Sequence, residues 1–217
     1  MASTIQIPDN FRAIILDFTN DLSNTFPEFA DKWSKWNNPN LSSIDLQELF
    51  NYCVNTFPAR FFDIIYQNQD LFGPESTINV EFLPGIDFKM LFNCSEISEQ
   101  TKKSLWKYLQ LILITVVGDM KDKQTFGDTL NLFDNIDETE LHDKLSETIS
   151  GITDFFDESI ENGRNSNQTD QPTPNNSNKT DGLPDIQDHL QSLLNGKIGA
   201  LAKEMADDIA DDFKDVL

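Results

Sequence analysis

The sequence predicts an all-α protein with three parts: an aromatic-rich helical domain over residues 5–160, a disordered linker over 161–183 and an amphipathic acidic helix over 184–217. Three observations lead to this prediction. Apolar residues recur at spacings of three and four, the periodicity of helices with one buried face. Nearly all of the 17 phenylalanines precede residue 160, and each buried ring removes a large apolar area from water. Residues 161–182 contain no aliphatic or aromatic residue.

The first helix is expected to begin near Asp9, directly after Pro8. Pro27 breaks or restarts it, because proline cannot donate to the preceding turn but suits the first turn of a new helix. The apolar face then continues to a loop at residues 37–40, which is rich in asparagine. The apolar positions of these two segments are Phe11, Ile14, Ile15, Phe18, Leu22, Phe29, Trp33 and Trp36.

The second region repeats this arrangement. Ser42 and Ser43 offer N-caps for a helix through Cys53, and Pro58 marks a restart that carries Phe61 and Tyr66. The tetrapeptide Asn-Thr-Phe-Pro occurs at residues 24 and 55. It is either a chance repeat or the trace of two related helix–break–helix units.

Residues 67–95 are expected to be irregular, with turns at Pro84-Gly85 and a short extended segment over 78–82, where apolar residues alternate. Residues 95–98 offer caps for a long helix that is apolar on most sides and is therefore central. Residues 125–135 are expected to form a loop or a short helix, and a further helix is expected from residue 137 to 156. The residues expected to be buried together are Phe61, Trp106, Leu109, Leu113 and Val116.

The segment 184–217 carries an apolar stripe at helical spacing, with aspartates on the opposite face. A single helix cannot bury such a stripe alone, so it either folds back onto the domain or binds a partner protein in a groove. Partner binding is favoured, and the outer aspartates predict a basic partner surface. The candidate partner-binding residues are Leu190, Leu194, Ile198, Leu201, Met205, Ile209 and Phe213.

Charge and composition exclude several classes of protein. With 16 basic and 37 acidic residues the net charge is -21, which disfavours binding to nucleic acid and to anionic membranes, although the charge also serves solubility alone. The apolar run from Leu109 to Val117 is too short to span a bilayer. Cys53 and Cys94 are expected to be buried free thiols in a reducing compartment. The N-terminus does not resemble a signal peptide, so we expect a protein that is not secreted.

The sequence shows no catalytic constellation, and we expect a protein that is not an enzyme and needs no cofactor or metal. His142 and His189 are expected on polar helix surfaces. Residues 134–138 lack the glycine and the terminal glutamate of a calcium loop. The only compact basic group, formed by Lys102, Lys103 and Lys107, is either a basic–aromatic patch beside a tryptophan or the polar face of the central helix.

Four segments, at residues 59–68, 81–88, 105–113 and 194–204, resemble an uncharacterised protein family of nucleocytoplasmic large DNA viruses that infect algae and protists. The resemblance implies a viral source and a setting in the host cytoplasm or the virion, and it transfers no functional residue. We therefore expect a non-enzymatic viral protein-interaction or assembly factor that acts through helical surfaces. The alternatives are an internal structural component of the virion and an enzyme with an unrecognised active site.

Overall fold

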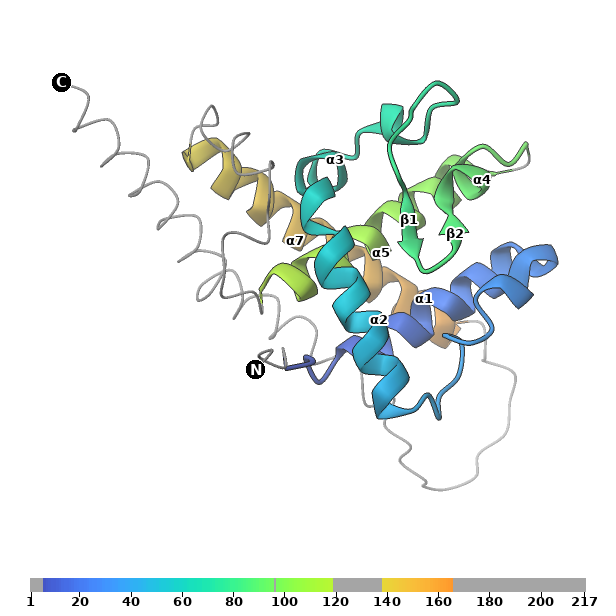
Figure 1. The fold of residues 1–217 in the computed structure, drawn as a ribbon. Coiled ribbons are helices and arrows are strands. Elements are labelled where there is room, and N and C mark those ends of the chain that lie inside the picture. The colour runs from blue at the N-terminus through green and yellow to red at the C-terminus, as the bar shows by residue number, and fades with distance from the viewer. Residues whose placement is uncertain (1–5, 96, 119–137, 166–217) are drawn as a thin grey trace, which may run out of the picture.

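A computed structural model describes residues 6–95, 97–118 and 138–165 of the chain (Figure 1). These residues are predominantly helical, as the sequence predicts. The α-helices are α1 (Phe11–Thr25), α2 (Ser43–Thr56), α3 (Phe61–Ile65), α4 (Phe88–Phe92), α5 (Glu99–Val117) and α7 (Glu138–Asn165). The 3-10 helices are η1 (Pro27–Lys32), η2 (Pro58–Arg60) and η3 (Gln69–Phe72), and a small hairpin is formed by β1 (Glu81–Leu83) and β2 (Ile86–Asp87).

Helix α5 is the centre of the fold. It packs against α1, α2, α3 and α7 (Figure 1). Every residue from Leu105 to Gly118 is buried. The hydroxyl of Ser98 begins the helix by accepting a hydrogen bond from the backbone N–H of Thr101 at 3.0 Å, as an N-cap does. A helix that is apolar all round must be surrounded by other elements, and four helices surround this one.

The two Asn-Thr-Phe-Pro segments form similar but not identical breaks. In each, an α-helix ends at the threonine, the phenylalanine is buried and the proline begins a 3-10 helix. The backbone differs at the phenylalanine, because Phe57 keeps helical angles whereas Phe26 has φ -128° and ψ 65°. The similarity is thus local, and proline accounts for it because it lacks the N–H that would continue the α-helix.

The region after Pro27 does not form the expected second helix. Only Pro27–Lys32 is helical, as the 3-10 helix η1, and turns follow it. This path buries the Trp33 ring completely and lets its Nε1 donate a hydrogen bond to the hydroxyl of Ser23 at 2.8 Å. A buried indole N–H needs such a partner, and a turn that returns the ring to α1 provides it.

Residues 67–95 contain more regular structure than expected. Strands β1 and β2 pair in an antiparallel hairpin around Pro84-Gly85, and Gly85 adopts the positive φ of 75° that the third position of a type II turn requires. The hydroxyl of Tyr52 on α2 donates to the carbonyl oxygen of Glu81 at 2.7 Å, which fastens the hairpin to the helical core. The predicted extended segment thus forms a strand, displaced toward Leu83.

Helix α3 ends in a Schellman arrangement. The backbone N–H of Gln67 donates to the Ile64 carbonyl, and that of Asn68 donates to the Asp63 carbonyl. Gln67 has φ 52°, a left-handed conformation that glycine usually supplies. The buried Gln110 on α5 reinforces this end, because its Nε2 donates to the carbonyls of Ile64 and Ile65 at 3.2 Å each.

The predicted core is confirmed, and so is the helix after residue 137. Phe61, Trp106, Leu109, Leu113 and Val116 are each at most 5% exposed and belong to one hydrophobic cluster. Helix α7 continues to Asn165, so residues 161–165, which composition assigned to the linker, are helical. A helix can be extended by polar residues once begun, because each added residue gains a backbone hydrogen bond. The rest of the expected linker, residues 166–183, and the expected helix 184–217 lie outside the described residues.

Candidate functional site

A small cleft lies between the C-terminal half of α1 and the N-terminal half of α5, and we call it the α1–α5 cleft. Its volume is about 110 Å³. Its apolar wall consists of Phe18, Leu22, Phe26, Leu105 and Tyr108. Its polar residues are Asp21, Thr25, Gln100, Thr101 and Ser104. Small-molecule sites typically measure about 300–1,000 Å³, so this cleft has room for a few water molecules or one side chain.

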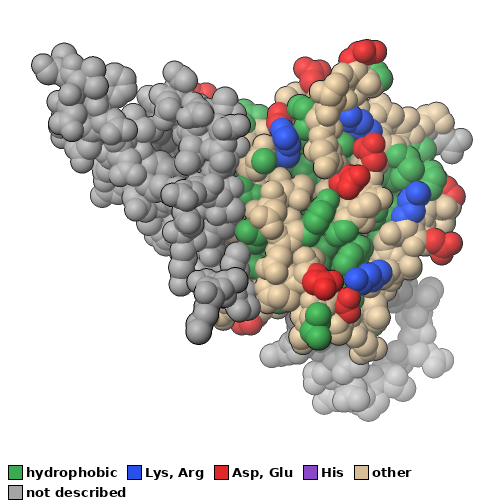
Figure 2. Space-filling view, viewed as in Figure 1, with side chains coloured by type: hydrophobic (Ala, Val, Ile, Leu, Met, Phe, Trp, Pro, Cys, Tyr) green, Lys and Arg blue, Asp and Glu red, His purple; other side chains and the backbone are tan. Residues whose placement is uncertain are grey.

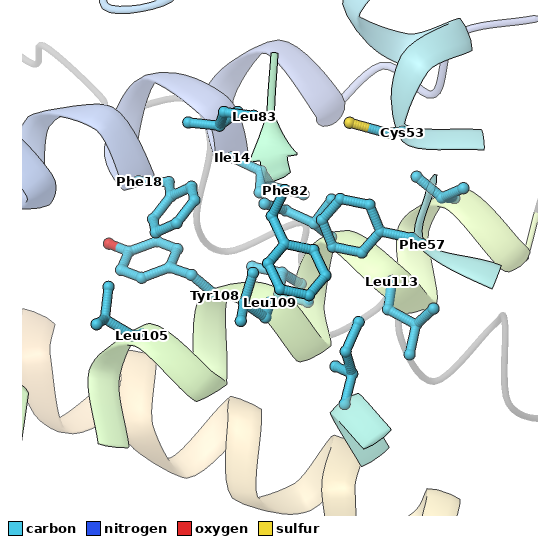
Figure 3. Close-up of a cluster of buried hydrophobic side chains, with 14 of the residues drawn as sticks. Ile14, Phe18, Cys53, Phe57, Phe82, Leu83, Leu105, Tyr108, Leu109 and Leu113 are labelled. Atoms are coloured by element: carbon cyan, nitrogen blue, oxygen red, sulfur yellow. The ribbon is translucent and has the colours of Figure 1, made fainter. Parts of the chain in front are cut away.

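A hydrogen bond across the two helices organises the cleft. The hydroxyl of Tyr108 donates to Oδ2 of Asp21 at 2.6 Å. The rings of Phe18 and Tyr108, which face each other in Figure 3, stack with their centroids 5.0 Å apart. Tyr108 is also in edge contact with Phe156 of α7, which fixes the ring from the other side. Burial, with the hydrogen bond to Asp21, raises the pKa of Tyr108, so its hydroxyl remains a donor at neutral pH.

Negative charge is concentrated beside this cleft. Asp17 and Asp21 are four residues apart on α1 and therefore lie on the same side of the helix. Burial and, secondly, the charge of Asp21 raise the pKa of Asp17. The last turn of α1, residues 22–25, contains no basic residue, although its free carbonyls form the negative end of the helix dipole. Among the residues that the structure describes, none forms an ion pair with Asp21.

A second, wide and open depression lies between the end of α3 and the start of α7. Tyr66, which is 41% exposed, contributes its aromatic ring, and Glu140, Asp143 and Glu147 contribute acids. The cation for this surface comes from the chain itself, because Nζ of Lys144 lies 5.7 Å from the Tyr66 ring centroid and 2.8 Å from Oε2 of Glu147. Lys144 therefore neutralises part of the negative charge of this depression.

The three lysines of α5 do not form a shared basic surface. Lys102 pairs with Glu99 at 2.9 Å, and Lys103 is exposed. Lys107 is 8% exposed and lies against α7, where the absence of a side chain at Gly151 makes room for its ammonium group. Burial, together with the nearby charge of Lys103, lowers the pKa of Lys107. The expectation that Lys107 belongs to a polar face or to an accessible patch was wrong, since α7 covers it.

Most of the other site predictions fall outside the described residues. These include all seven candidate partner-binding residues, from Leu190 to Phe213, as well as His189 and the acidic segment 134–138. His142 belongs to α7, but its side chain is outside the description. Both cysteines are free thiols; Cys53 is fully buried, which raises its pKa, and Cys94 is half-buried rather than buried.

The sequence contains one signal for the α1–α5 cleft that hydrophobic periodicity does not reveal. Two aspartates four residues apart on one helix are unfavourable to that helix through mutual repulsion. Such a local violation is expected where function requires it. The contribution of Tyr108 could not be found this way, because it lies 87 residues from Asp21 in the chain.

Comparison with known family models, curated protein sequences and solved structures gave no match. None of the helices among the described residues is both long and apolar enough to span a membrane. Within the same residues, no cluster of three or more histidine, cysteine, aspartate or glutamate side chains is positioned to hold a metal ion.

Proposed function

We propose that this chain is a non-enzymatic protein-interaction or assembly factor that presents helical surfaces to a basic protein partner. The observation that carries the proposal is that the described helices bury one another. Helix α5 is enclosed by α1, α2, α3 and α7, and Ile44 and Tyr66 are the large hydrophobic residues that remain exposed among the described residues. The helical domain thus supplies its own core.

If the helical domain does not need the apolar stripe from Leu190 to Phe213 for its core, the stripe can bind another protein. A stripe of this length needs a complementary apolar surface. On the part of the face in Figure 2 that is not covered by grey atoms, the hydrophobic side chains form patches between polar and charged ones. This arrangement supports docking of the stripe into the groove of a second protein. The net charge of -21 favours a basic partner and disfavours nucleic acid and anionic membranes.

The resemblance to an uncharacterised viral family supports the host cytoplasm or the virion as the place of action, and this remains a prediction. An assembly factor and an internal virion component differ in abundance. Fractionation of purified particles distinguishes them, because a structural component is present in many copies in the particle and an assembly factor is not.

Deletion of residues 183–217 tests the proposal. Because the described helices form their own core, we expect the melting temperature to stay within about 2 °C of the full chain, less than the shift from a loss of about 1 kcal/mol. Co-purification of a partner from infected cells should be lost. A matched pair of full-length variants provides the control: Leu201→Asp on the stripe should abolish co-purification, and Asp208→Asn on the predicted outer face should not. A large drop in melting temperature on deletion would make the segment part of the core and contradict the proposal.

A further inference from the structure

Helix α1 carries two aspartates whose mutual repulsion is unfavourable for the helical domain. Asp17 and Asp21 repel each other at a spacing of four residues, and the last turn of α1 contains no basic residue. By contrast, the N-terminus of α5, which borders the cleft, has favourable partners. Ser98 caps its first turn, and Glu99 places a negative charge at the positive end of the helix dipole. Among the described residues, Asp21 accepts a hydrogen bond from the hydroxyl of Tyr108 but has no cationic partner.

The shape of the α1–α5 cleft agrees with a single extended side chain. Its volume of about 110 Å³ is too small for most organic ligands, and its apolar wall of Leu22, Phe26 and Leu105 suits a chain of methylene groups. Asp21 is exposed at the cleft, and the hydroxyl of Tyr108 holds its carboxylate in place. Lysine and arginine have this combination of an apolar stem and a cationic end.

At the depression beside Tyr66, a similar combination of an aromatic ring and acids is already paired with a cation of the chain. There, Lys144 of the chain lies over the aromatic ring and pairs with Glu147. In the α1–α5 cleft the aromatic wall and the acid are present, but none of the described residues places a cation beside the acid. A cation from another molecule would therefore gain more binding free energy at the α1–α5 cleft than at the depression beside Tyr66.

We propose that the α1–α5 cleft binds one lysine or arginine side chain of a basic protein partner, with the cationic group paired to Asp21 and the stem packed on Leu22 and Leu105. This inference rests on the proposed function, since it names a contact of the same basic partner. It involves residues of the helical domain instead of the stripe at residues 190–213. The two proposals can therefore fail separately.

The test uses the full chain and a short capped peptide in which one lysine is flanked by leucines, with norleucine in place of lysine as the neutral probe. Binding is followed by backbone amide chemical shifts at physiological ionic strength. We expect the lysine peptide to shift the amides of Asp21, Thr25 and Ser104, and the norleucine peptide to leave them unchanged. Asp21→Asn should weaken binding by up to about tenfold, because it removes the charge that pairs with the cation, and tenfold corresponds to about 1.4 kcal/mol.

Two further variants separate the cleft from the overall charge. Asp70→Asn removes the same charge from an exposed position on η3, outside the cleft, and should change the affinity less than twofold. Ser104→Leu fills the cleft without changing charge and should abolish the shifts. An equal loss for Asp70→Asn and Asp21→Asn would overturn the proposal, as would unimpaired binding by Ser104→Leu.

An internal occupant is the remaining alternative. Seven lysines and arginines of the chain lie beyond the residues whose side chains are described, at positions 121, 123, 164, 179, 197, 203 and 214. If replacing one of them with glutamine shifts the amides of Asp21 and Ser104 without any peptide, the cleft is filled by the chain itself and the partner proposal is wrong. If deletion of residues 183–217 abolishes partner binding and the peptide still binds, the two contacts are independent, as proposed.

Discussion

Removal of the Trp106 ring tests how the core is closed at the N-terminal half of α5. Trp106 is 3% exposed, and its ring centroid lies 5.2 Å from that of Phe72 on η3 and 5.3 Å from that of Phe92 on α4. Phe72 and Phe92 also stack on each other, at 3.7 Å. The three rings join α5 to two short elements whose few backbone hydrogen bonds cannot hold them in place.

The expected effect follows from the buried area. A buried aromatic side chain removes about 150–250 Å² from water. At about 25 cal/mol per Å², this corresponds to ~4–6 kcal/mol, an upper bound because the unfolded chain already buries part of its surface. We therefore expect Trp106→Ala to lower the free energy of unfolding by about 3–5 kcal/mol. For a chain of this size, the melting temperature should fall by roughly 6–20 °C.

Urea unfolding followed by circular dichroism measures this change. Trp106→Phe keeps an aromatic ring against Phe72 and Phe92, and should lose less than half as much. Tyr66→Ala is the control, because that ring is 41% exposed and its loss should cost less than about 1 kcal/mol. Equal effects of Trp106→Ala and Tyr66→Ala would show that the three-ring contact does not hold α5 to its neighbours, and the reasoning would be wrong.

Three other predictions concern local strain and charge. Gln67→Gly should raise the free energy of unfolding, measured in urea, by about 0.5–1 kcal/mol, because glycine adopts the φ of 52° without strain. A decrease would show that the Gln67 side chain contributes packing instead. Asp17→Asn should stabilise the protein at pH 7 by about 0.2–0.5 kcal/mol through relief of repulsion with Asp21. Since the folded pKa of Asp17 is raised, its charge destabilises the fold above that pKa, and the gain should vanish in thermal unfolding below pH 3.8, where the carboxyl is protonated in both states. Gly151→Ala should raise the free energy of unfolding by about 1 kcal/mol in a Lys107→Ala background and by clearly less in the wild-type chain. The reason is that the new Cβ would lie 2.7 Å from Nζ of Lys107. Equal gains in both backgrounds would show that the two residues are not coupled.

Local physical chemistry determined the parts of the fold that the sequence predicted correctly. Ser42 and Ser98 begin helices because a serine hydroxyl can accept a hydrogen bond from a free N–H of the first turn. Pro27 and Pro58 end α-helices because they lack an N–H. The apolar density of residues 105–117 required a central helix, since no exposed state of such a segment is stable. Each of these results depends on residues within a few positions of one another.

The tertiary structure alone decided how distant residues meet. The sequence did not indicate that Tyr108 would reach Asp21, or that Lys107 would be buried against Gly151, because both contacts depend on how α1 and α7 pack on α5. Trp33 turns back to Ser23 instead of continuing a helix for the same reason, since burial of its ring outweighs the periodicity of its segment. Helical pattern specifies which face of an element is buried, whereas the neighbour on that face is selected by the packing of side chains from the whole chain.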